Sequence, residues 1–259
     1  MIAYYKRELL SYFRSPTGWV AMALYAIISG FFFSSWIPSG GFDLSGEFVF
    51  VSGILFIVVP IITMRLFSEE KKTGTDVLMY TASSSLSGIV VAKYLAALTL
   101  FLLMNITLLI HMLILLIFGG EINAVTVGSL FGLLLLGAVF IAIGTFASAT
   151  TENQIIAALL SFTVILLSRF VFIFSEQFRS ITVGILSALN VFGISSERIA
   201  SAGNGVRDAM NWLDPYAKVD DYFIGVFRIQ PIIFCVSVIV FFLFLTYRLM
   251  EKRRWSQNG

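Results

Sequence analysis

IVVAKYLAALTLFLLMNITLLIHMLILLIF, residues Ile89–Phe118, is an apolar stretch that contains one lysine, Lys93, and one histidine, His111. The hydrocarbon core of a bilayer is about 30 Å thick, so about 20 apolar residues in a helix can cross it. Five other stretches are also apolar and close to that length: Thr17–Ile37, Phe48–Met64, Val125–Ala149, Ile155–Phe174 and Pro231–Leu249. The sequence therefore predicts an all-α integral membrane protein with six transmembrane helices in a single domain over residues 1–259.

The composition supports this fold class and excludes several others. Hydrophobic residues make up 58% of the chain and charged residues 12%, whereas soluble domains carry about a quarter charged residues. The net charge of +2 gives no argument for nucleic acid as a partner, and membrane lipids are the surroundings expected. One cysteine, Cys235, excludes an internal disulfide and a C-x-x-C site, and we predict no metal site.

The lysines and arginines indicate the orientation of the chain. Most of them precede the first span, lie between spans two and three, or follow span six. The short loops Pro38–Glu47 and Gly119–Ala124 carry none. Cytoplasmic loops are enriched in basic residues, so both termini are expected in the cytoplasm.

Residues 175–230 must then lie mostly outside, between spans five and six. Within them Ile181–Ile194 is uncharged, but a helix of that length reaches only about 21 Å and is too short to cross. We expect a re-entrant or interfacial helix there.

The N-terminal residues 1–16 have a separate pattern. Apolar residues recur at helical spacing, and the basic residues lie off that stripe. This pattern favours an amphipathic helix on the cytoplasmic membrane surface, with a solvated basic tail as the alternative. The apolar stripe consists of Ile2, Tyr5, Leu9, Tyr12 and Phe13.

Residues 65–88 form the loop with the richest pattern. The second span is expected to continue as a helix through Lys72, where Glu69 and Lys72 can pair. Gly74 is a natural helix stop, and Thr75 can begin a second short helix.

This second helix would carry Asp76 in its first turn and Leu78 in an apolar surface. A short amphipathic helix between two long membrane helices could couple a cytoplasmic partner to them. An ordinary charged intracellular loop fits the same pattern.

A few residues inside the spans stand out. Asn105 and His111 could line a pathway, or could form hydrogen bonds between helices that hold the bundle together. Pro60 removes a backbone donor near the end of span two and could serve as a hinge or as a packed kink. Span four has small residues, among them Gly128 and Gly144, that allow close helix packing, with a dimer seam as one place for it.

Four stretches resemble one known family. Residues Met64–Thr75, MRLFSEEKKTGT, are similar to the M-R-L-F-A-E-E-[KR]-[KR]-[ST]-G-T signature of type-2 ABC transporter permeases, above all of the gliding-motility and nitrous-oxide-maturation branch. Residues Lys6–Pro16 resemble the opening of that family, Ala147–Gln154 resemble its S-S-x-T-E-N-Q turn, and Glu251–Trp255 resemble its basic close. The family commonly continues with T-S-P after its coupling helix, whereas Thr81–Ser84 contain no proline.

The resemblance implies a permease subunit of a bacterial cytoplasmic-membrane transporter, in most family members an exporter. Such permeases dock a separate cytoplasmic ABC ATPase subunit, which holds ATP and Mg²⁺, and pair with a second permease copy or a paralogue. An auxiliary membrane or extracytoplasmic subunit is a further expected partner. The loop that resembles the coupling helix would place these residues at the ATPase contact: Glu69, Glu70, Lys71, Lys72, Gly74, Thr75, Asp76 and Leu78.

No catalytic residues and no cofactor are predicted in the chain itself. Gly88–Lys93 lacks the second glycine of a phosphate-binding loop, so ATP hydrolysis would belong to the partner. The alternative function is an ATP-independent membrane transporter or a membrane scaffold subunit. A secondary transporter would be expected to show inverted repeats and charged residues near the membrane midplane.

Overall fold

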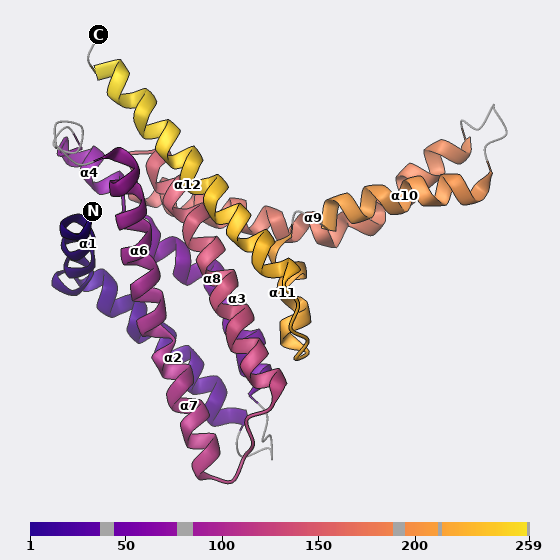
Figure 1. Cartoon of the computed structure of the whole chain (residues 1–259), viewed down its shortest axis with the longest axis horizontal. Coiled ribbons are helices and arrows are strands. Elements are labelled where there is room, and N and C mark those ends of the chain that lie inside the picture. The colour runs from indigo at the N-terminus through magenta and orange to yellow at the C-terminus, as the bar shows by residue number, and fades with distance from the viewer. Residues whose placement is uncertain (37–43, 77–84, 189–194, 212–213, 258–259) are drawn as a thin grey trace.

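The computed structural model describes residues 1–36, 44–76, 85–188, 195–211 and 214–257, and all regular elements in this part of the chain are helices (Figure 1). Five helical units are long and apolar enough to cross a membrane, and a bent sixth brings the number to that expected from the sequence. The first five are α2 (Pro16–Trp36), α3 (Ser45–Thr63), α6 (Leu86–Met104) with α7 (Ile106–Ile117), α8 (Ala124–Thr150) and α12 (Gln230–Gln257). The sixth is α9 (Gln154–Ala188), whose two parts, Gln154–Phe170 and Phe174–Ala188, differ in direction by 52°.

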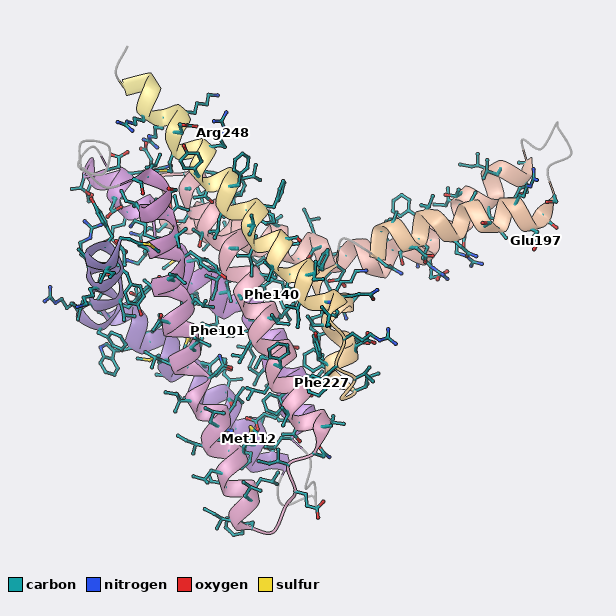
Figure 2. All side chains as sticks on the ribbon, in the orientation of Figure 1. Phe101, Met112, Phe140, Glu197, Phe227 and Arg248 are labelled. Carbon is teal, nitrogen blue, oxygen red and sulfur yellow. The ribbon has the colours of Figure 1, made fainter. Side chains whose placement is uncertain are left out.

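Helix α8 is the centre of the bundle and packs against α3, α6, α9 and α12. Figure 2 shows Phe101 of α6 and Phe140 of α8 among the side chains inside the bundle, and both are buried. A Cβ atom at Gly144 would lie 2.2 Å from the hydroxyl oxygen of Thr63, and one at Gly128 would lie 2.4 Å from the carbonyl oxygen of Tyr222. These small residues therefore serve contacts within the chain, and a dimer seam is not needed to explain them.

The third predicted span is divided into two helices. Helix α6 ends at Met104 and α7 begins at Ile106. The side-chain Nδ2 of Asn105 donates to the backbone carbonyl oxygen of Phe101 at 2.7 Å. The hydroxyl of Tyr25 donates to the side-chain Oδ1 of Asn105 at 2.9 Å. An asparagine side chain that bonds to its own helix backbone competes with the regular ladder, which accounts for the break at this residue.

The N-terminal helix is present as α1 (Ile2–Arg14), and α2 begins directly after it at Pro16. Helix α1 packs along α6 and α2, with Tyr12 on its buried face. The hydroxyl of Tyr12 donates to the carbonyl oxygen of Ile62 at 2.6 Å, so α1 is attached to the end of α3. Glu8, one turn earlier, is also buried, which the apolar stripe of this helix does not predict.

The segment between spans five and six begins within α9. Helix α9 runs through Ala188, so residues 181–188 are the last part of this long helix, and residues 189–194 lie outside the described residues. The re-entrant or interfacial position expected for this segment stays a prediction. Helix α10 (Ser196–Asn211) packs back along α9. Together they form an arm that leaves the bundle sideways (Figure 1).

Helix α11 (Pro215–Phe223) returns from the arm to the bundle and packs on α8. Its N-terminal Asp214 accepts a hydrogen bond from the backbone of Tyr216 at 2.9 Å and one from Arg169 of α9 at 3.0 Å. Burial raises the pKa of the Asp214 carboxyl above its ordinary value, while these donors act in the opposite direction. The Arg169–Asp214 ion pair thus fixes α11 beside the bend of α9.

Candidate functional site

A short helix follows α3, at the end of the bundle where Figure 1 also places both termini. Helix α3 ends at Thr63, residues 64–67 form a turn, and α4 (Ser68–Thr73) follows. Span two therefore continues in helical structure through Thr73, as the sequence predicts, but the turn at residues 64–67 divides it into two helices. The hydroxyl of Ser148 on α8 accepts from the backbone N–H groups of Phe67 and Ser68, at 3.0 and 3.2 Å, and donates to the carbonyl oxygen of Met64 at 3.0 Å.

One buried hydroxyl thus provides the hydrogen bonds that the break in the helix would otherwise leave unmade. Ser148→Ala is expected to lower the free energy of unfolding by about 1–3 kcal/mol, because buried backbone groups at Phe67 and Ser68 lose their partner. The measurement is thermal unfolding of the purified chain in detergent.

Ser34→Ala is the matched control for Ser148→Ala, because Ser34 is exposed and bonds within its own helix. Its effect should stay within about 0.5 kcal/mol. Equal unfolding midpoints for the two variants would contradict the role assigned to Ser148.

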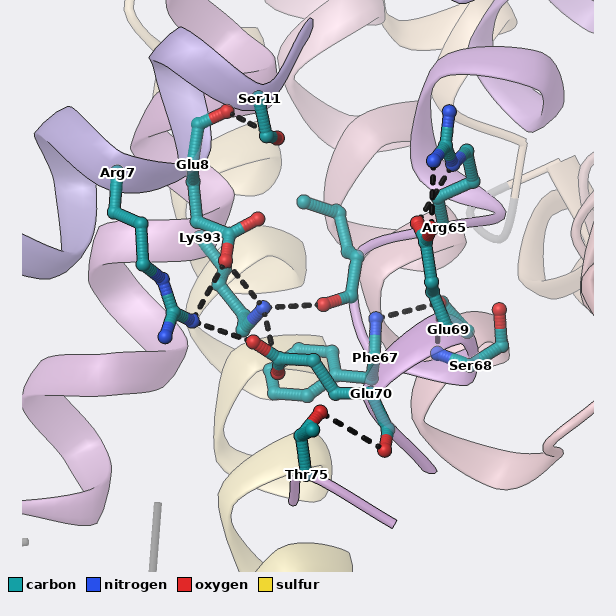
Figure 3. Close-up of polar contacts among 12 residues, drawn as sticks. Arg7, Glu8, Ser11, Arg65, Phe67, Ser68, Glu69, Glu70, Thr75 and Lys93 are labelled. Carbon is teal, nitrogen blue, oxygen red and sulfur yellow. Dashed lines mark hydrogen bonds and ion pairs between the residues drawn. The ribbon is translucent and has the colours of Figure 1, made fainter. Parts of the chain in front are cut away.

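A cluster of charges joins α4 to α1 and α6 (Figure 3). Lys93 of α6 lies 2.8 Å from a carboxylate oxygen of Glu8 on α1 and 2.9 Å from one of Glu70 on α4. Arg7 of α1 pairs with both carboxylates, at 3.0 Å with Glu8. The cluster contains two cations and two anions, so its charges balance.

Lys93 is the member of this cluster that is fully removed from solvent. Its ammonium also donates to the carbonyl oxygen of Leu66 in the turn between α3 and α4, and lies 5.1 Å from the ring centre of Phe67. A buried ammonium is tolerated when it is paired and its N–H groups are bonded. Lys93 therefore holds the turn, α1 and α4 in one arrangement.

A second set of polar contacts joins α4 to the opposite side of the bundle. The ammonium of Lys71 donates to the carbonyl oxygen of Ala149 at the end of α8. Arg253 of α12 pairs with Glu152 in the turn between α8 and α9. The Nε atom of Arg253 is also 3.6 Å from a carboxylate oxygen of Asp76, near enough for an ion pair but too far for a hydrogen bond.

The exposed edge of this region consists of Lys72, Thr73, Gly74 and Thr75. Beside it is a hollow of about 480 Å³, lined by Lys72 and by residues 152–155 of the turn between α8 and α9. A convex edge next to a hollow is a surface on which another protein can dock.

The residues predicted at the partner contact fall into four groups. Lys72, Gly74 and Thr75 are exposed, Lys71 and Asp76 are buried, and Leu78 lies outside the described residues together with most of the expected second helix. Gly74 ends α4 with φ of +70°, in the left-handed region that favours glycine, which confirms it as the helix stop.

The remaining two residues, Glu69 and Glu70, are partly exposed and engaged within the chain. Glu69 accepts two hydrogen bonds of 2.7 Å from Arg65, so the expected pair with Lys72 is wrong. Arg65 is one turn before Glu69 and also reaches Thr17 at 2.9 Å, so its position is better fixed than that of exposed Lys72.

The polar residues inside the spans are used in contacts between helices. His111 of α7 lies with its Nδ1 atom 2.6 Å from a carboxylate oxygen of Glu47 on α3, and its ring stacks on Phe33 of α2. Ser29 of α2 donates to the same oxygen at 2.6 Å. These bonds, like the bond between Asn105 and Tyr25, connect helices of the bundle. A position of Asn105 and His111 beside a transport pathway stays a prediction.

Pro60 lies within α3, fully buried, and the helix continues through it to Thr63. The turn that ends α3 follows at residues 64–67, one turn later. A hinge at Pro60 stays a prediction.

The sequence analysis did not identify four residues that this structure places at central positions: Glu8, Glu47, Lys93 as an ion-pair partner, and Ser148. The sequence does contain a signal for the ion pair of Glu8 and Lys93. Glu8 is one turn from Tyr12 on an otherwise apolar face, and Lys93 is a charge inside an apolar run, so each needed a partner of opposite sign.

Comparison with known proteins finds no family model that matches this chain and no similar curated protein. The geometry itself describes a bundle of membrane-type helices in which one short, partly exposed helix is joined by ion pairs and hydrogen bonds to α1, α6 and α8. Arg253 of α12 lies close to Asp76, which follows this helix.

Proposed function

We propose that this chain is the membrane-spanning permease subunit of an ATP-driven transporter of the type-2 ABC kind, an exporter in a bacterial cytoplasmic membrane with both termini in the cytoplasm. One observation carries the proposal. The four stretches that resemble this family are far apart in the sequence, yet they meet around α4. Arg7 of the first pairs with Glu70 of the second, Ser148 of the third bonds Ser68, and Arg253 of the fourth pairs with Glu152.

The contacts also support a mechanical role for α4. A force on its exposed edge would act on α1 and α6 through Glu70, and on α8 through Ser68 and Lys71. The chain needs no chemistry of its own in this mechanism, because the work would come from ATP binding and hydrolysis in a separate subunit. A partner shifts an equilibrium between conformations by its differential affinity for them.

The ATPase subunit would dock on the edge Lys72–Thr75 and in the hollow beside residues 152–155. The rest of the coupling helix expected from Thr75 onward falls in residues 77–84, outside the described residues. A second permease copy or a paralogue would form the other half of the transporter, with an auxiliary membrane or extracytoplasmic subunit as a further partner.

The test is purification of the tagged full-length chain from native membranes, followed by assay of Mg²⁺-dependent ATPase activity that co-purifies with it. The wild-type chain should retain such activity. Lys72→Glu should reduce it at least tenfold, because Lys72 is exposed at the rim of the hollow and makes no ion pair that this helix needs. Gly74→Pro should also remove it, since proline cannot adopt the φ of +70° found there.

Lys252→Glu is the matched control, because Lys252 is exposed on the same end of the bundle and outside the hollow. It should leave the co-purified ATPase activity unchanged. If the wild-type chain brings down no ATPase, the proposal fails and an ATP-independent transporter or scaffold is favoured. Equal activity with Lys72→Glu and Lys252→Glu would remove the docking surface proposed here.

A further inference from the structure

The arm formed by α10 and the second part of α9 has one apolar and one polar side. Along α9, large apolar side chains recur at spacings of four, three and four residues, which places them on one face of the helix. They are Phe174, Phe178, Ile181 and Ile185, here called the arm stripe, and each is between 46% and 55% exposed.

The opposite face of α9 is covered by α10. A Cβ atom at Gly203 of α10 would lie 2.5 Å from the side chain of Val183, and the guanidinium of Arg179 donates to Asn204 at 2.6 Å. Ile199 of α10 is buried, and no large apolar side chain is exposed along α10, Ser196–Asn211. Among the described residues of the arm, the arm stripe therefore carries most of the exposed large apolar side chains, with Leu186 near the end of α9 as a further one at 36% exposure.

Charged side chains occupy the rest of the hairpin. Arg207 of α10 pairs with Glu176 of α9 at 3.3 Å and with Asp208 at 3.0 Å, and Glu176 also pairs with Arg179. Glu197 lies near the far end of the arm (Figure 2). A hairpin with a charged side and a narrow apolar side has the surface of an amphipathic helix that lies in a membrane interface.

The arm stripe is continuous with the apolar surface of the spanning part of α9. Leu167 and Phe170 precede it at the same spacing and are exposed, and the rings of Phe170 and Phe174 stack with centres 6.0 Å apart across the bend. The bend of 52° turns the helix away from the bundle while this surface continues. We propose that the arm lies on the external membrane interface, with the arm stripe inserted among lipid acyl chains.

The area of the stripe favours lipid over a second copy of this chain. Four side chains, each about half exposed, offer on the order of a few hundred Å², whereas stable protein interfaces bury about 1,200–2,000 Å² in total. A lipid interface has no such minimum, because it is continuous with the lipid around the spans. The proposal needs membrane insertion of the chain, and it does not depend on an ATPase partner.

Nitroxide labels on the full-length chain test it in vesicles of phosphatidylethanolamine and phosphatidylglycerol. Labels are placed at Phe178→Cys, Ile181→Cys and Ile185→Cys, one at a time, with Ser201→Cys on exposed α10 as the matched control. The native Cys235 is buried, so it should take up little label. Labelling of the wild-type chain measures this background. The measurement is the collision rate with oxygen, which concentrates in lipid, and with a water-soluble nickel complex.

The ratio of oxygen to nickel collisions is expected to be several-fold higher at the three stripe positions than at Ser201. Equal ratios at all four positions, with free access to nickel, would place the stripe in water and overturn the proposal. Low access to both reagents at the stripe would also overturn it, because the stripe would then be covered by protein, a second copy of the chain included. Elution of each variant at the wild-type volume in size-exclusion chromatography shows that the substitution leaves the fold intact.

Discussion

Replacement of Lys93 by methionine is expected to lower the free energy of unfolding by about 3–5 kcal/mol, the usual cost of removing one partner of a buried ion pair. Lys93 is fully buried between Glu8 and Glu70. Without its ammonium, Arg7 is the remaining cation of the cluster for two carboxylates, and Arg7 is half exposed. The carbonyl oxygen of Leu66 also loses its donor.

Thermal unfolding of the purified variants in detergent measures this effect. Lys72→Met is the matched control, since it makes the same chemical change at an exposed position on α4 and should stay within about 0.5 kcal/mol of the wild type. The double variant Lys93→Met with Glu8→Gln should be more stable than Lys93→Met alone, because one unpaired charge is removed. The ion cluster would lose its assigned role if Lys93→Met and Lys72→Met unfolded at the same temperature.

The spanning helices could be predicted from the sequence because their signal is local. An apolar run such as Val125–Ala149 fixes its own length and secondary structure, and α8 matches it within a residue at each end. The helix stop at Gly74 was predictable for the same reason, since it depends on one residue that tolerates a positive φ.

The breaks and bends were not predictable because their causes lie elsewhere in the chain. The turn after α3 depends on Ser148, which is 81 residues from Phe67 in sequence, and on Lys93, which is 85 residues from Glu8. Hydropathy shows that residues 68–72 are polar, but it does not show which of them are paired inside the chain.

The arm illustrates a different limit of sequence analysis. Ile181–Ile194 is too short to cross a bilayer, and that length argument led to the expectation of a re-entrant or interfacial helix. Instead, the first eight of these residues extend α9, because α10 offers Gly203 and Asn204 as partners for its other face. The absence of charge identified an apolar segment, and the packing of α10 on α9 shows to which helix its first residues belong.

The second large effect on stability is expected from substitution of Gly144, which lies at the contact between α8 and the end of α3. Gly144→Ala is expected to lower the free energy of unfolding by about 1–3 kcal/mol, because its Cβ atom would lie 2.2 Å from the hydroxyl oxygen of Thr63. Thr63 cannot easily yield, since it is β-branched, fully buried and bonded to the carbonyl oxygen of Val59 at 2.8 Å. Gly144→Leu should cost more than Gly144→Ala and should displace the turn that leads into α4.

Gly53→Ala provides a control in which the opposite sign is expected. Gly53 lies in α3, is exposed, and has no atom within 4 Å of the place where a Cβ atom would stand. Alanine is the better helix former by up to about 1 kcal/mol, so Gly53→Ala should raise the thermal unfolding midpoint while Gly144→Ala lowers it. A rise for both variants would mean that α8 and α3 do not pack closely at Thr63. The short helix α4 would then be less firmly connected to the centre of the bundle than its contacts indicate, and the lever proposed for it would lose its support.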